Sequence, residues 1–310
     1  MEYQPAVLQA GRASLEVLPQ LGMIATSLRV DNIEFLAMPR RVEQYVDGHC
    51  TGMPLLHPWA NRLAKCTYPV PATSGHNPAV ISFEPDDVHL DRNGLPIHGT
   101  MQGRAFDVIA HSDAAITATY EFGTGNEGPK LLKSFPFPHR ITIDMELQSV
   151  GNEHRCIVTT RIDNNGTAEM PISFGWHPFF VLPSRPRAAW KLRTPACDRH
   201  ELSALLLPTG TTSQYPELTD VIGDRTYDDH FALGKDRTFV INDDDHSITV
   251  QFDAGYPHLQ LYLPGAEGLL PGDFVCIEPM TAPSNALVVA TAPTIGRGNR
   301  YDATFTITIS

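Results

Sequence analysis

The sequence predicts an all-β protein, a sandwich or barrel of antiparallel strands with few short helices. Apolar and polar residues alternate with a period of two in many short segments, which is typical of half-buried antiparallel strands. Turn-forming residues separate these segments, and the chain holds 23 glycines and 26 prolines among its 310 residues. A chain of this length can bury a sizeable core without a disulfide or a metal, and we expect one domain over residues 1–310.

The clearest predicted strand covers residues 116–122. Its sequence ITATYEF places Ile116, Ala118, Tyr120 and Phe122 on one face. The same reading predicts further strands at 141–147, 156–162, 247–252, 259–263, 286–291 and 304–309.

Turns and helices complete the predicted organisation. Turns are expected at Asn93-Gly94, at Asn164-Asn165-Gly166 and in the acidic run 242–246. Residues 38–46 and 197–206 could each hold a short helix, although neither carries a long apolar stripe with convincing caps. The pattern of many short strands and regular turns therefore favours one all-β domain.

Charge and cysteine content limit the classes of partner and compartment. The 23 lysines and arginines against 35 aspartates and glutamates give a net charge of −12, which disfavours nucleic acid and anionic membranes as partners. The five cysteines include no C-x-x-C pair, so neither a disulfide scaffold nor a zinc ribbon is indicated. The sequence also lacks a signal-peptide pattern and an apolar run of about 18 residues. We expect a cytoplasmic protein.

Two polar motifs lie in the first hundred residues. Asn61-Arg62 follows an apolar segment, and an amide beside a guanidinium supplies fixed donors for hydroxyl or carboxylate oxygens. A turn asparagine beside a surface arginine is the alternative. His98 precedes Gly99, where the backbone can approach another group closely. A structural histidine is the alternative there.

Two more candidates lie in the second half of the chain. His177 stands in the aromatic segment 172–183, and aromatic rings form either a hydrophobic core or a platform for the apolar face of a sugar. Glu278 ends an apolar, strand-like run. A carboxylate there is costly unless it is paired, hydrogen-bonded or functional, and burial would raise its pKa toward that of a general base. The alternative is a glutamate that bonds the following turn.

Several familiar chemistries are not indicated. No G-x-S-x-G nucleophile elbow, Walker A motif or G-x-G-x-x-G motif is present. The 13 histidines lack H-x-H and H-E-x-x-H spacing, so the sequence predicts no metal site. We expect an enzyme without a metal, a nucleotide or any other cofactor.

Six segments in one order along the chain together resemble the aldose 1-epimerase (galactose mutarotase) family. The family's segments read N-R, L-H-G, H-P-Y-F, D-x-x-F, Q-x-Y and E-P-x-T-x-P-x-N-A. In this chain they are Asn61-Arg62, Ile97-His98-Gly99, His177-Pro178-Phe179-Phe180, Asp228-Asp229-His230-Phe231, Gln260-Leu261-Tyr262 and the run from Glu278 to Ala286. The resemblance implies that family's fold, a large antiparallel β-supersandwich, which agrees with the strand pattern.

The resemblance also implies an acid–base pair. In the family the H-P-Y-F histidine is the general acid and the E-P glutamate is the general base, which are His177 and Glu278 here. The L-H-G histidine, His98, is a second active-site histidine. Because acid and base act on two oxygens of one sugar carbon, we expect the reactive atoms of the pair to lie within about 8 Å of each other.

The remaining family residues bind the sugar. The N-R arginine and the D-x-x-F aspartate hold sugar hydroxyls, which implies Arg62, with Asn61 beside it, and Asp228. Asp229 is the alternative to Asp228, because an alignment shifted by one residue would exchange them.

Three departures from the family pattern concern sugar preference. The family often has tyrosine where Phe179 stands and glutamine where Met280 stands, and Thr100 replaces a second glycine. Methionine cannot donate the hydrogen bond that glutamine would, so the preferred sugar is expected to differ.

The leading hypothesis is a cofactor-independent aldose 1-epimerase whose partner is a small, free sugar. A hexose-6-phosphate 1-epimerase is the first alternative. It needs a cationic phosphate site, for which Arg40, Arg41, Arg92 and Arg104 are candidates, although the net charge of −12 disfavours an anionic substrate. The second alternative is a non-catalytic carbohydrate-binding protein, against which the presence of both acid and base argues. No feature of the sequence specifies an oligomeric state.

Overall fold

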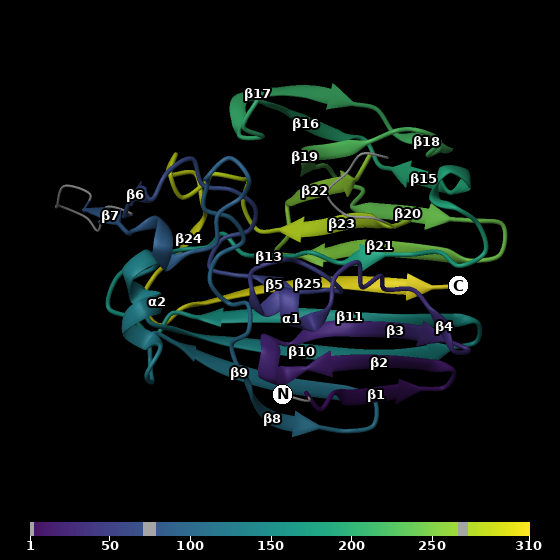
Figure 1. The fold of residues 1–310 in the computed structure, drawn as a ribbon, viewed down its shortest axis with the longest axis horizontal. Helices are drawn as coiled ribbons and strands as arrows, with labels where there is room; N and C mark the ends of the chain where they lie inside the picture. The colour runs from purple at the N-terminus through teal and green to yellow at the C-terminus, as the bar shows by residue number, and fades with distance from the viewer. Residues whose placement is uncertain (1–2, 71–78, 266–271) are drawn as a thin grey trace.

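Antiparallel sheets dominate the structure, a computed structural model that describes residues 3–70, 79–265 and 272–310 (Figure 1). The largest sheet has nine strands, and between the named strands described here every pairing is antiparallel. Across this sheet the strands run β18 (Leu218–Val221), β15 (Lys191–Thr194), β20 (Thr238–Asn242), β21 (Ser247–Ala254), β25 (Arg300–Ile309), β11 (Glu153–Asp163), β10 (His139–Val150), β9 (Ala115–Phe122) and β8 (Asp107–His111).

A second, eight-stranded sheet carries most of the chemistry described below. Across it the strands run β17 (Pro208–Tyr215), β16 (Cys197–Leu202), β19 (Tyr227–Leu233), β22 (His258–Leu263), β23 (Val275–Met280), β13 (Gly175–Trp176) and β5 (Leu55–Leu56). The eighth strand, β14 (Phe179–Phe180), also pairs with β23, so the chain between β13 and β14 leaves the sheet and returns to it.

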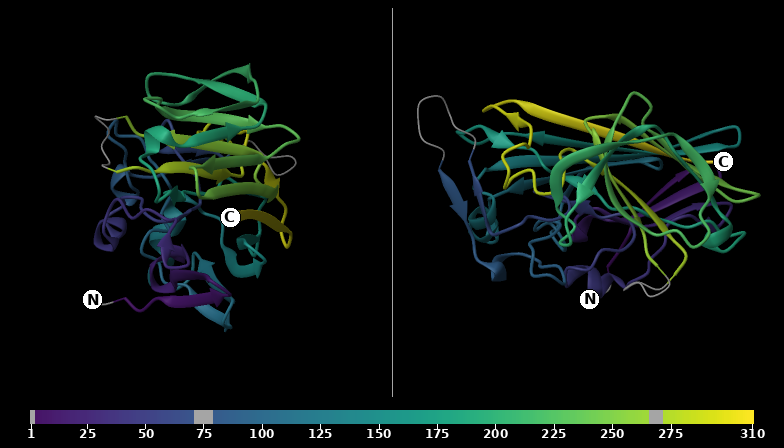
Figure 2. Two further views of the ribbon diagram at one scale, coloured as in Figure 1. Left: turned by 90° about the vertical axis from the view of Figure 1, so that its right-hand side faces the viewer. Right: turned by 90° about the horizontal axis from the view of Figure 1, so that it is seen from above.

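Smaller elements complete the fold. A four-stranded meander is formed by β1 (Ala6–Ala10), β2 (Ala13–Leu18), β3 (Ile24–Val30) and β4 (Ile33–Glu34). Two-stranded sheets join β6 (Thr67–Pro69) to β7 (Val80–Ser82) and β12 (Met170–Pro171) to β24 (Thr294–Ile295). In Figure 1 and the left view of Figure 2, the purple N-terminal strands lie at the opposite end of the molecule from the green strands β16 and β17.

Helices are short. The α-helices within the described residues are α1 (Val42–Val46) and α2 (Gly128–Ser134), and single 3-10 turns cover Pro19–Leu21, Pro85–Asp87 and Arg187–Ala189. In the part of the chain that the structure describes, no helix has the length and apolar character needed to cross a bilayer.

The core forms because alternate residues of each strand point inward. Met145 on β10 lies between Ile116 on β9 and Val158 on β11, and all three are buried. Leu259 and Leu261 on β22 belong to the same apolar cluster, which therefore spans the two large sheets. Each such side chain contributes about 1.5–3 kcal/mol when it is removed from water.

The predicted fold class is confirmed, and so are six of the seven predicted strands. Strands β9, β10, β11, β21, β22 and β25 cover the alternating segments. The acidic run 242–246 forms the expected turn between β20 and β21, in which Asp243 accepts the backbone N–H groups of Asp245 and His246. That residues 1–310 form one domain stays a prediction.

Two local predictions are wrong. The segment 197–206 is not a helix, because it pairs with β17 on one side and β19 on the other, and this pairing overrides its helix-forming residues. The segment 286–291 is not a strand. Its backbone forms turns after Asn285, and the carbonyl of Asn285 accepts hydrogen bonds from the N–H groups of Val288 and Val289. The helix predicted within 38–46 is present but short, because α1 covers only Val42–Val46. The sequence did not predict α2, which follows a glycine-rich turn and has no side-chain cap.

Candidate active site

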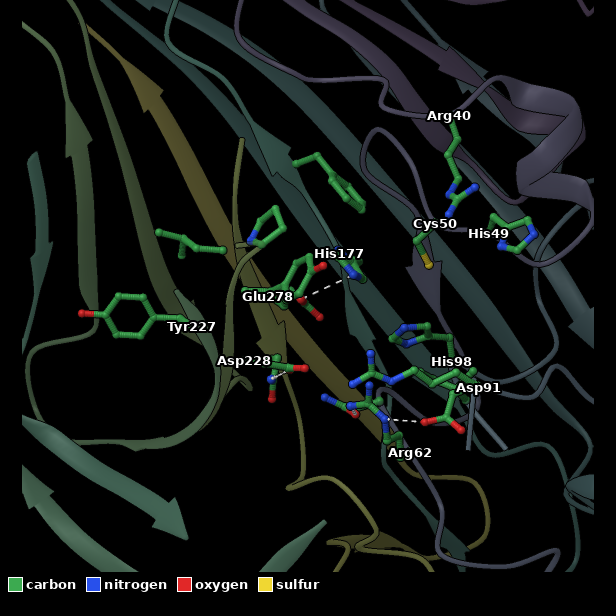
Figure 3. A pocket seen from close by; sticks show the side chains of 18 of the residues that line it. Arg40, His49, Cys50, Arg62, Asp91, His98, His177, Tyr227, Asp228 and Glu278 are labelled. Carbon is green, nitrogen blue, oxygen red and sulfur yellow. Dashed lines mark hydrogen bonds and ion pairs between the residues drawn. The ribbon is translucent and has the colours of Figure 1, made fainter. Parts of the chain in front are cut away.

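One pocket of about 680 Å³ brings together all the candidate site residues (Figure 3). Strands β19, β22 and β23 of the eight-stranded sheet contribute Asp228, Gln260 and Glu278. The chain after β5 and the loop before Gly99 contribute the other side of the pocket. The predicted residues that line it are Asn61, Arg62, His98, His177, Asp228 and Glu278.

His177 and Glu278 face each other inside this pocket. The distance from His177 Nε2 to Glu278 Oε1 is 3.4 Å, well inside the 8 Å that we expected. Glu278 lies on the central strand β23, whereas His177 lies where the chain leaves the sheet between β13 and β14, with its backbone N–H donated to the carbonyl of Pro54. The imidazole stacks on Phe179 with ring centroids 4.5 Å apart and planes 3° apart. An aromatic ring at this position therefore fixes the plane of His177.

Burial sets the charge state of this pair. Burial, and then the negative charge of Asp228, raise the pKa of Glu278 well above its ordinary value, although Arg62 opposes the rise. Burial also lowers the pKa of His177 to about 3, and Arg62 acts in the same direction. Both shifts favour the neutral forms of the two groups, a carboxylic acid beside a neutral imidazole. Passing the carboxyl proton to the imidazole produces a carboxylate and an imidazolium without adding or removing charge.

Both members of the pair keep a free polar atom. Within the described residues, Nδ1 of His177 and Oε2 of Glu278 are buried without a hydrogen-bond partner. Buried polar atoms are paired in the great majority of structures, because an unpaired one costs about 1–3 kcal/mol. Each group therefore keeps unused hydrogen-bonding capacity at the site.

His98 is the second histidine of the site. Its ring meets that of His177 edge to face, with centroids 5.4 Å apart, and its backbone N–H donates to the carbonyl of Asn61. Burial first, and then the neighbouring His177, lower the pKa of His98 well below its ordinary value. It has a φ of +61°, a left-handed conformation that is uncommon outside glycine and that often occurs at functional sites.

Gly99 explains how the two loops of the site stay together. One loop holds His57 and Arg62, and the other holds Ile97 and Gly99. Two isolated β-bridges join them, one between His57 and Gly99 and one between Arg62 and Ile97. A Cβ atom on Gly99 would lie 2.1 Å from the carbonyl oxygen of His57, and its φ is +71°. The close approach that the sequence indicated is therefore a contact between backbones, which holds His98 and Arg62 in place.

Arg62 is oriented by two neighbours. Its Nε donates to Asp91 Oδ2 at 2.8 Å, and its Nη1 donates to Asn61 Oδ1 at 3.1 Å. Sequence reasoning missed Asp91, although it precedes the predicted Asn93-Gly94 turn and its other oxygen accepts the N–H groups of Asn93 and Leu95. The remaining guanidinium N–H groups line the pocket, while Asn61 acts on Arg62 through its side-chain oxygen.

Strand alternation separates Asp228 from its neighbour Asp229. Asp228 lines the pocket and accepts a hydrogen bond from Gln260 Nε2 at 2.6 Å. Asp229 instead forms an ion pair with Arg199 at 2.5 Å. Successive side chains of a strand point to opposite faces, so only one of the two can face the pocket. Sequence reasoning noted Gln260 only as part of a motif, and the register beside Glu278 gives it a place in the site.

Two of the four arginines considered for phosphate binding also line the pocket. These are Arg40 and Arg92, whereas Arg104 is paired with Glu127 at 2.8 Å and Arg41 is the N-cap residue of α1. Among the described residues, the pocket therefore carries two cations besides Arg62, and Arg40 is labelled in Figure 3.

Potential metal ligands occur in the pocket, but they include thiols. Two groups have ligand atoms within 4.8 Å of one another, Cys50 with His98 and His177, and Cys276 with His177 and Glu278. Burial, followed by the charge of Glu278, raises the pKa of both thiols. Without a bound metal, both thiols therefore hold their protons at neutral pH.

Comparisons with known proteins find one matching family and a set of structures with the same fold. The profile of the aldose 1-epimerase family matches residues 6–308. A galactose mutarotase-like protein from Clostridium acetobutylicum is 19% identical, with 100% of this chain and 96% of that chain covered and a TM-score of 0.82. An aldose epimerase homologue from C. elegans is 14% identical (100% and 99% covered, TM-score 0.79), and galactose 1-epimerase from Lactobacillus acidophilus NCFM is 13% identical (100% and 99%, TM-score 0.73). A comparison with curated proteins finds no match.

Proposed function

The chain belongs to the aldose 1-epimerase family, and on this premise we propose that it interconverts the α and β anomers of a free aldose. One observation carries the proposal. A buried imidazole and a buried carboxyl group lie 3.4 Å apart in a pocket, close enough to exchange a proton, and each keeps an unpaired polar atom. The reaction needs one acid and one base on two oxygens of the same carbon, which is what such a pair supplies.

The proposed cycle begins when the carboxyl group of Glu278 transfers its proton to the imidazole of His177. The carboxylate then removes the proton of the anomeric hydroxyl O1 while the imidazolium protonates the ring oxygen O5. The C1–O5 bond breaks, its electron pair stays on O5, and C1 becomes an aldehyde carbon. Rotation about C1–C2 presents the other face of the aldehyde, and ring closure returns each proton by the reverse transfers. Arg62 favours the carboxylate, because its positive charge lowers the pKa of Glu278.

The other pocket residues hold the ring hydroxyls in this proposal. Arg62 presents its free N–H groups from a fixed orientation, and Asp228 presents an acceptor from the opposite side (Figure 3). Fixing the sugar in this way makes the proton transfers effectively unimolecular.

Asp228 and its neighbour provide a matched test of the sugar contacts. Asp228→Asn is expected to raise KM by about tenfold, because it weakens a charge-assisted hydrogen bond of about 1.4 kcal/mol or more to a sugar hydroxyl. Asp229→Asn, which loses only the pair with half-exposed Arg199, is expected to leave KM near the wild-type value. Steady-state kinetics of both variants check this. A larger effect at Asp229 would contradict the assignment of Asp228.

Polarimetry tests the activity itself. The purified protein is added to freshly dissolved α-anomers of a panel of hexoses and pentoses, and the approach to equilibrium rotation is followed. We expect at least one free sugar to equilibrate faster than in buffer, with a rate proportional to enzyme concentration. Measurable sugar binding without any acceleration would instead favour a non-catalytic carbohydrate-binding protein.

A hexose-6-phosphate 1-epimerase is the second candidate, because Arg40 and Arg92 line the pocket. The net charge of −12 favours the neutral sugar, although two well-placed arginines outweigh net charge locally. The comparison is kcat/KM for α-D-glucose against its 6-phosphate at two salt concentrations. An advantage of about tenfold for the phosphate that shrinks with salt, about 1.4 kcal/mol of screened attraction, would establish this alternative.

We also propose that the protein works in the cytoplasm. All five cysteines are free thiols, as expected in a reducing compartment.

A further inference from the structure

A second cluster of histidines lies beside the pocket on the eight-stranded sheet. His200 on β16, His230 on β19 and His258 on β22 each offer one nitrogen, and these three nitrogens lie within 4.8 Å of one another. Nε2 of His230 is 3.3 Å from Nδ1 of His258, and the rings of His200 and His230 have centroids 4.6 Å apart. The three histidines are not among the residues that line the pocket.

Strand register brings these residues together. Arg199 pairs with Phe231, so His200 lies opposite His230 one position further along. His230 in turn pairs with Gln260, and His258 stands two residues before Gln260 on the same strand. All three side chains therefore project from one face of the sheet. Their separations of 30 and 28 residues explain why a search for closely spaced histidines misses them.

Burial keeps the three imidazoles uncharged and leaves one of their nitrogens without a hydrogen-bond partner in the described part of the chain. His230 is fully buried, and within the described residues Nε2 of His200 has no hydrogen-bond partner. Burial lowers the pKa of all three, that of His258 to about 4, and their mutual proximity adds to the effect at His230 and His258. Neutral imidazole is the form that coordinates a metal, so no proton has to leave at neutral pH.

We propose that His200, His230 and His258 form a binding site for a divalent transition-metal ion of the Zn²⁺ class. Zn–N bonds of about 2.0–2.1 Å in a tetrahedron place the nitrogens about 3.3–3.4 Å apart. Nε2 of His230 and Nδ1 of His258 already have that spacing, and the ion would replace the hydrogen-bond contact between them. His200, which is only partly buried, would supply the third nitrogen. Three imidazoles suit zinc, copper and nickel better than hard cations, which prefer oxygen ligands.

The bound ion would join β16 to β19 and β22, and these last two strands also carry the pocket. Gln260 pairs with His230 on one side and with Glu278 on the other, and it donates to Asp228. The metal would thus stiffen the wall of the pocket from outside it. The site does not depend on the epimerase activity and is tested without it.

The experiment measures Zn²⁺ binding to the full-length chain by competition with a chromophoric chelator, after removal of metal by dialysis. One ion per chain is expected. His200→Gln and His258→Gln are each expected to weaken binding by about tenfold or more. The exposed His111→Gln, on β8, is the matched control and should bind like the wild type. Cys50→Ser removes a thiol from the pocket and should also have no effect, which separates this site from the pocket residues.

Co²⁺ and heat provide readouts that do not depend on any single variant. The visible spectrum of the Co²⁺-loaded wild type should be that of a tetrahedral nitrogen site without a thiolate-to-metal charge-transfer band. Zn²⁺ should raise the Tm of the wild type and not that of the His200→Gln/His258→Gln double variant. Failure of the wild type to bind would overturn the proposal. So would a thiolate band that disappears in Cys50→Ser, because it would locate the metal in the pocket.

Discussion

Replacing His177 with alanine or Glu278 with glutamine is expected to lower kcat by about a hundredfold or more, because each change removes one of the two proton-transfer groups. Sugar binding should largely survive, since Arg62 and Asp228 are unchanged. Polarimetric kcat, together with calorimetric binding of the sugar, checks both parts of the expectation. Glu201→Gln, at an exposed position of β16, is the matched control and should retain full activity. Near-normal turnover in a folded His177→Ala or Glu278→Gln protein would refute the proposed mechanism.

The same glutamine variant should be more stable than the wild type at neutral pH. The pKa of Glu278 is raised above its ordinary 4.5 in the folded protein, so between these two values the folded state holds a proton that the unfolded state has lost. Wild-type stability therefore falls with rising pH in this window, by up to about 1.4 kcal/mol per pH unit. Glutamine does not titrate and escapes this loss.

Denaturant unfolding of both proteins at pH 4.5 and pH 7.5 measures this effect. The difference in unfolding free energy should move in favour of Glu278→Gln by about 1.4 kcal/mol or more between the two pH values. The titration of His177 enters both proteins and largely cancels in the difference. An inactive variant that gains stability cannot owe its inactivity to misfolding, and a pH-independent difference would show that Glu278 is not buried in its neutral form.

Gly99→Ala is expected to cost about 3 kcal/mol or more of stability and to lower kcat. The new Cβ would lie 2.1 Å from the carbonyl oxygen of His57, a backbone atom that can move away only with its loop. The left-handed φ of +71° adds about 1–2 kcal/mol for a residue with a side chain. Because the same contact positions His98 and Arg62, activity should fall with stability.

Gly94→Ala isolates the effect of that contact. Gly94 has nearly the same φ, +75°, but a Cβ atom there would meet nothing within 4 Å. It should therefore cost only the conformational part, about 1–2 kcal/mol, and leave kcat unchanged. Thermal unfolding and kinetics of the two variants give the comparison. Equal losses at both positions would mean that the loop contact contributes nothing.

Strands whose alternation is strong could be predicted from the sequence, because burial on one face imposes a period of two. Segment 116–122 became β9 for this reason. Segment 197–206 could not be predicted, because its charged residues suit a helix and only pairing with two distant strands makes it β16. In 286–291 the β-branched residues favour a strand, but Asn285, with a φ of +68°, starts turns instead.

The candidate site was predictable where the chemistry lies in single motifs. His177, Glu278 and Arg62 stand in short segments whose residue types already indicate acid–base and hydroxyl-binding groups, and the resemblance orders them. What the sequence could not provide is register. The contact of Asp91 with Arg62 spans 29 residues, and the choice between Asp228 and Asp229 depends on which face of β19 each one occupies.

Because Glu278 and His177 are almost fully buried, they exchange few protons with bulk water. In the proposed cycle His177 regains on ring closure the proton that it gave on ring opening, and Glu278 returns the proton that it took, so a complete turnover leaves the pair in its starting state. A hydrolase must in addition admit the water molecule that it consumes. An anomer exchange has no such requirement. The pair can therefore lie almost wholly out of solvent, with 9% of the His177 side chain and 2% of the Glu278 side chain exposed, and it needs no chain of proton donors to the surface.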